Sequence, residues 1–84
     1  MKHARNDYAP IQDPRGLIPE DEPVFLLRAQ DEVAPQVVEI WAMAAHKAGA
    51  KADIVQHAYV HAQLMRKWQA EHGSKIPDMP QGSV

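Results

Sequence analysis

Apolar residues recur at helical spacing through the second half of the chain. In the segment DIVQHAYVHAQLMRKWQAEHG, which runs from Asp53 to Gly73, they return every three or four positions. Because an α-helix turns about 100° per residue, these positions share one stripe, and the pattern predicts a helix over about 54–72. The stripe holds Ile54, Ala58, His61, Met65, Trp68 and His72, with His57, Val60 and Leu64 beside it.

A second helix is predicted just before it, over about 32–48. Asp31 is the expected N-cap, Pro35 suits the first turn, and Gly49 suits the position after the last turn. Asp53, with a glutamine three residues later, resembles a capping box that starts the following helix. A short connection between two amphipathic helices makes them antiparallel neighbours. The apolar face expected on this helix consists of Val33, Val37, Ile40, Trp41, Ala44, Ala45 and Ala48.

The residues before the helices are predicted to form an irregular arm. Residues 1–23 hold four of the seven prolines, and Asp13-Pro14-Arg15-Gly16 has the chemistry of a type I turn. The short apolar run 24–27 fits either an extended strand or a first helical turn, and we favour the strand, which needs a partner edge in the arm or in a second copy. The predicted fold is therefore mainly α: an arm (1–23), an extended segment with an antiparallel helical hairpin (24–73), and a flexible tail (74–84).

The apolar arc of the second predicted helix is broader than one packing partner needs. It spans roughly 220°, against about 100° or more for an ordinary surface helix. The chain has 84 residues, and 13 of them are alanines, so large core side chains are scarce. We therefore expect a non-enzymatic interaction module that forms a homodimer or binds a target protein. The interaction residues expected are Phe25, Trp41, His57, Val60, His61, Leu64, Met65 and Trp68.

Composition argues against several other classes of protein. The net charge of −2 disfavours a nucleic-acid partner. The N-terminal ten residues lack an apolar signal segment, and no run approaches the roughly 18 apolar residues of a membrane span, so we expect a cytoplasmic protein without a membrane partner. Catalytic nucleophiles are nearly lacking, since the chain has no cysteine or threonine and its only serines are Ser74 and Ser83. We expect no enzymatic activity and no cofactor.

Two histidines carry an alternative prediction. His57 and His61 stand four residues apart, the spacing that presents two imidazoles to one metal ion from a single helix. The pair lacks the glutamate of the HExxH pattern, and no further ligands stand at characteristic spacing. A zinc-binding module and a pair of packing histidines with hydrogen-bonded rings are both open interpretations.

The segment between the turn and the first predicted helix carries a resemblance. Asp13-Pro14-Arg15-Gly16, then DEPVFLLRAQD (21–31) and the helix VAPQVVEIWAMAAHKAG resemble a group of short proteins of uncharacterised function from phage, prophage and proteobacterial genomes. The likeness covers roughly Tyr8 to Trp68. It implies a phage-related accessory protein that works by binding another protein, and it assigns no activity and no residue roles.

Overall fold

The computed structural model describes residues 2–3 and 13–78. Within these ranges the elements are β1 (Lys2–His3), β2 (Pro23–Val24), α1 (Ala34–Lys47) and α2 (Ala52–His72). The chain divides into two compact units. Leu27–Pro77 form one unit, which contains both helices, and the described residues outside this range belong to the other.

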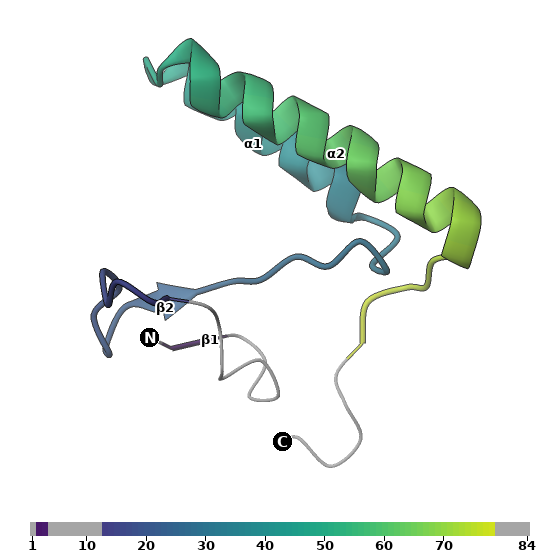
Figure 1. Ribbon diagram of the computed structural model, residues 1–84, viewed down its shortest axis with the longest axis horizontal. Coiled ribbons are helices and arrows are strands. Elements are labelled where there is room, and N and C mark those ends of the chain that lie inside the picture. Colours follow the sequence, from purple (N-terminus) through teal and green to yellow (C-terminus); the bar gives the residue numbers. More distant parts are fainter. Residues whose placement is uncertain (1, 4–12, 79–84) are drawn as a thin grey trace. The chain divides into compact units, whose positions relative to one another are not determined.

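The two helices pack against each other as an antiparallel hairpin (Figure 1). The predicted fold class is therefore confirmed. The end of α1 is also as expected, because Gly49 adopts a φ of 92° and donates its N–H to the His46 carbonyl at 3.0 Å. The Ala50 N–H bonds to the Ala45 carbonyl at 2.9 Å. Together these bonds form a Schellman motif, which turns the chain sharply into the connection to α2.

The predicted N-caps are wrong. Val33 precedes α1 and Lys51 precedes α2, and neither side chain bonds to its helix. Asp31 lies before the capping position and contributes only its backbone carbonyl, which accepts a hydrogen bond from the N–H of Ala34. Asp53 already lies inside the first turn of α2. A carboxylate there still faces the positive end of the helix dipole, so it stabilises the start of α2 without acting as a cap.

Small side chains make the contact between the helices. Ala42 of α1 and Ala62 of α2 are both 0% exposed, and Met65 is 7% exposed. Among the described residues no large side chain is fully buried. Alanine at the contact lets two helix axes approach closely, because the interaxial distance follows the side chains between them. We call the buried alanine and methionine residues of the two helices the seam. They are Ala34, Ala42, Ala58, Ala62 and Met65.

The apolar face predicted for α1 is not the face that packs against α2. Ile40 is 62% exposed and Trp41 is 51% exposed, whereas Ala42, about 100° further round the helix, is buried. The close approach of the two backbones selects the alanine side of the helix. The larger apolar side chains are therefore displaced to the surface of the hairpin.

Two sets of hydrogen bonds hold the segments that flank the hairpin. The side-chain amide nitrogen Nε2 of Gln69, in α2, donates hydrogen bonds to the backbone carbonyls of Ala29 at 2.8 Å and Asp31 at 3.1 Å. Lys75 forms backbone bonds with Gln30 and Glu32, each 2.8 Å long. The segment before α1 is thus tied both to α2 and to the residues that follow it. Lys75 belongs to the predicted tail, of which residues 79–84 lie outside the described residues.

The other unit contains a short parallel pairing. Lys2 lies opposite Pro23, and His3 lies opposite Val24. We expected the apolar run 24–27 to be extended. Its first residue, Val24, does belong to a strand, β2, and the partner strand β1 lies within the predicted arm. The Gly16 N–H bonds to the Asp13 carbonyl at 3.0 Å, as the predicted turn requires. Residues 1 and 4–12 of the predicted arm lie outside the described residues.

Candidate interaction face

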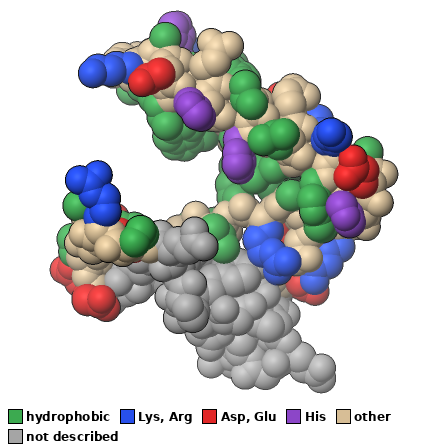
Figure 2. Space-filling model, in the orientation of Figure 1, with side chains coloured by type: hydrophobic (Ala, Val, Ile, Leu, Met, Phe, Trp, Pro, Cys, Tyr) green, Lys and Arg blue, Asp and Glu red, His purple; other side chains and the backbone are tan. Residues whose placement is uncertain are grey.

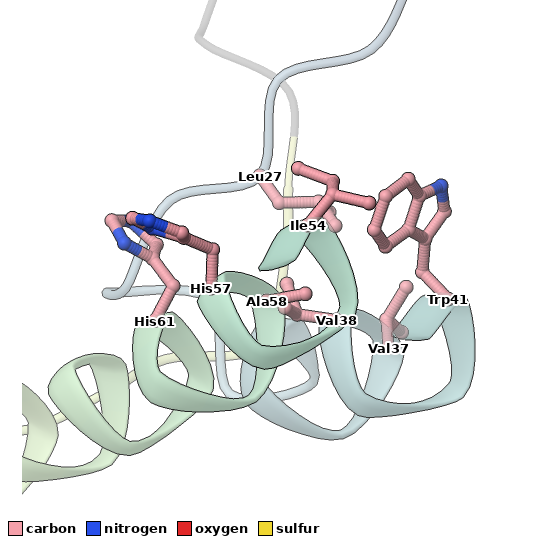
Figure 3. Close-up of a pocket in the computed structure, with 8 residues that line it drawn as sticks. All are labelled: Leu27, Val37, Val38, Trp41, Ile54, His57, Ala58 and His61. Atoms are coloured by element: carbon pink, nitrogen blue, oxygen red, sulfur yellow. The ribbon is translucent and has the colours of Figure 1, made fainter. Parts of the chain in front are cut away.

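One side of the hairpin is hollowed by an apolar pocket. Its volume is about 360 Å³, and both helices contribute to its walls (Figure 3). In Figure 3, Trp41 stands at one side of the pocket and the rings of His57 and His61 stand together at the other. The lining side chains are Leu27, Val37, Val38, Trp41, Ile54, His57, Ala58 and His61.

The apolar surface continues along α2 beyond the pocket. Leu64 is 55% exposed and Trp68 is 39% exposed. Helical spacing places both on the side of α2 that carries the two pocket histidines. Figure 2 shows hydrophobic side chains and histidines at the surface of the hairpin. We call this surface the hairpin face and define it by Val37, Trp41, Ile54, His57, His61, Leu64 and Trp68.

The hairpin face carries no permanent charge. No acidic residue, lysine or arginine lines the pocket. On α2, the arc of about 80° from Leu64 round to Ile54 holds only apolar residues and histidines. Burying an unpaired charge is costly, whereas an uncharged surface is covered at little electrostatic cost. The face is therefore suited to being covered by a similar apolar surface.

The charged contact between the helices lies outside the hairpin face. Both terminal guanidinium nitrogens of Arg66 donate hydrogen bonds to the Glu39 carboxylate oxygens, with N···O distances of 2.7 and 2.6 Å. The hydrogen bond with Arg66 lowers the pKa of Glu39, and the same bond raises the pKa of Arg66. Tyr59 occupies this side of α2 as well, because it lies about 20° from Arg66 around the helix. The hairpin therefore has an apolar side and an ion-paired side.

The lowered pKa of Glu39 gives an expected pH dependence. A carboxyl group with a lowered pKa in the folded state stabilises the fold above its ordinary value of 4.5, and this contribution is lost as the pH falls through the folded pKa. We expect Glu39→Gln to lower the urea midpoint slightly at neutral pH, and we expect this deficit to shrink as the pH falls below 4.5. Glu71→Gln, which removes an exposed charge from α2, is the control. A deficit for Glu39→Gln that does not shrink in acid would contradict this assignment.

Five of the eight residues predicted for interaction lie on the hairpin face. They are Trp41, His57, His61, Leu64 and Trp68. Val60 is exposed at its outer margin, about 40° from Leu64. Met65 belongs to the seam instead, because its position on α2 points towards α1. Phe25 is 71% exposed and belongs to the other unit.

Two residues of the hairpin face, Val37 and Ile54, and one further pocket residue, Leu27, were not predicted for interaction. Val37 and Ile54 line the pocket, and Leu27 reaches it from the segment before α1. The helical periodicity already contained the signal for Val37 and Ile54, since both share a stripe with predicted residues. No periodic signal exists for Leu27, which lies outside both helices.

The histidine pair places two imidazoles on one wall of the pocket (Figure 3). Structural zinc sites take four ligands from the protein, and catalytic sites take three. Within residues 2–3 and 13–78, no group of three or more histidine, cysteine or acidic side chains is placed to hold a metal ion. Zinc binding by His57 and His61 stays a prediction that requires ligands from elsewhere. Trp68 and His72, further along α2, stack with ring centroids 4.4 Å apart.

No family model, curated protein or solved structure that was compared with the chain matches it. In the part of the chain that the structure describes, neither helix has the length and apolar character of a membrane span. Function must therefore be argued from the hairpin face itself.

Proposed function

We propose that this protein is a small non-enzymatic interaction module that binds a protein surface through the hairpin face. The observation that supports it most is that the hairpin buries small side chains and leaves large apolar ones exposed. Alanines and one methionine fill the seam, while both tryptophans of the chain are partly exposed on the same face. Tryptophan is the residue type most enriched among those that dominate binding energy at interfaces.

The chemistry of the face supports binding rather than catalysis. A contiguous apolar surface with a pocket and a charged opposite side is typical of an interaction site. The pocket wall offers imidazoles but no carboxylate or hydroxyl group beside them. The phage-related role implied by the resemblance is a further part of the proposal, and it rests on sequence likeness alone.

Cross-linking from two adjacent positions tests the proposal. A photoreactive benzoylphenylalanine is placed at Leu64, on the hairpin face, or at Gln63, which lies about 100° away on the solvent side of α2. Both side chains are exposed, so neither replacement disturbs the seam. Each protein is irradiated alone and in an extract of its source cells, and the adducts are identified by mass spectrometry.

We expect adducts from position 64, to this chain or to another protein, that exceed those from position 63 by at least about tenfold, because a bound partner contacts only the hairpin face. Equal yields from the two positions would overturn the proposal, since they would show that the face meets no specific partner. Helix content measured by circular dichroism checks that both proteins are folded.

A further inference from the structure

Building on the proposed interaction role, on which this step rests, we propose that the partner at the hairpin face is a second copy of this chain. The two hairpins pack face to face and form a four-helix bundle. Each copy then supplies the packing layer that the other lacks. The tryptophans, Ile54 and Leu64 become the core of the bundle.

The first support is the incomplete core of the single hairpin. Its buried apolar side chains are four alanines, one methionine and one proline in the described part of the chain. Small domains with so little buried apolar surface usually need a disulfide, a metal or oligomerisation to fold stably. The chain has no cysteine for a disulfide. A second copy is present wherever the chain is made, so it can satisfy this need without any other protein.

The second support is the size of the face. Two adjacent helices present a strip about 20 Å wide, and helices of 14 and 21 residues make it about 20–30 Å long. The projected area is about 400–600 Å², and the corrugated accessible surface is larger. A standard interface buries about 800 Å² per partner. The hairpin face is therefore of the order that a specific dimer requires.

The third support is self-complementarity. A two-fold interface brings the same patch of both copies together, so that patch must supply both hollow and projecting groups. The hairpin face holds an apolar pocket, and Trp41 and Ile54 at its walls are 51% and 47% exposed. The residues that define it also carry no permanent charge. The same surface thus meets the requirements of shape and charge for pairing with itself.

The solution mass of the full chain tests the proposal. Light scattering after size-exclusion chromatography is measured over about a 100-fold dilution, with tryptophan emission recorded on the same samples. We expect about twice the chain mass of 9.4 kDa at high concentration. Dilution should return the mass to that of one chain and shift the emission to the red, because both tryptophans then meet water. This comparison uses the unaltered protein and does not depend on the folding of any variant.

Two charge substitutions locate the interface. Leu64→Glu places a carboxylate on the hairpin face, and Gln63→Glu adds the same charge on the solvent side of α2. We expect Leu64→Glu to raise the dissociation constant by at least about 30-fold and Gln63→Glu to change it by less than about threefold. A dimer that responds equally to both variants uses another surface, which overturns the proposal.

These experiments also distinguish a failure of the dimer proposal from a failure of the proposed interaction role. A helical monomer at every concentration overturns the second copy as partner. If position 64 still cross-links specifically to another protein, the interaction role holds with a different partner. If it yields no specific adduct either, both proposals fail.

Discussion

Replacing Ala62 with leucine is expected to destabilise the hairpin by about 1–3 kcal/mol, the usual cost of inserting methylenes into a packed contact. Ala62 is 0% exposed and lies in the seam. A leucine there must push the helices apart or take an unfavourable rotamer. Either change also strains the bond between Arg66 and Glu39, which joins the same two helices. In a fold whose buried core is mostly alanine, this loss is a large share of the total stability.

The matched control for that change is Ala70→Leu. Ala70 lies two turns further along α2 and is exposed. The same substitution there should change stability by no more than about 0.5 kcal/mol. Urea unfolding followed by circular dichroism at one fixed protein concentration measures both variants. If the two leucines cost the same, the seam is not packed as the structure describes.

Replacing Trp68 with alanine is expected to weaken the proposed dimer by about 2–4 kcal/mol, as expected for a residue that dominates the binding energy of an interface. This corresponds to a dissociation constant raised roughly 30- to 1,000-fold. Trp68 is 39% exposed in the single hairpin, and a partner can bury this exposed part of its ring. The effect should therefore appear mainly in the dissociation constant and less in the helix content of the monomer.

Tyr59→Ala is the control for the tryptophan substitution. Tyr59 belongs to the same helix and is 38% exposed, but it lies on the ion-paired side of the hairpin. Both substitutions remove a half-exposed aromatic ring, and only one removes it from the hairpin face. We expect Tyr59→Ala to leave the dissociation constant within about threefold, as is usual outside an interface centre. Similar losses for the two variants, measured by sedimentation equilibrium, would argue against burial of the hairpin face in a dimer.

The position of Trp41 differs from the position expected from the sequence. From sequence, Trp41 was expected to belong to the packing face of its helix. In the structure it stands beside a pocket on the outer side of the hairpin. Alanines occupy the contact between the helices. For this one reason, large residues are scarce in the seam and abundant on the hairpin face.

The sequence by itself determined the two helices and the hairpin that they form. Periodicity of three and four, the glycine after each helix and the prolines near the chain ends act locally, within a few residues of where they stand. Glycine reaches a positive φ without steric cost, so Gly49 ends α1 whatever else surrounds it. The same local information placed His57, His61, Leu64 and Trp68 on one side of α2.

Only the tertiary structure decided which side of each helix is covered. Helical spacing groups residues on a face, but it does not state which face meets the neighbouring helix. That choice depends on how closely the backbones approach, and here it selected alanines such as Ala42 over Trp41. Contacts such as Arg66 with Glu39, 27 residues apart, and Gln69 with Ala29, 40 residues apart, follow from the alignment of whole elements. No local pattern encodes that alignment, because it results from the packing of the two helices on each other.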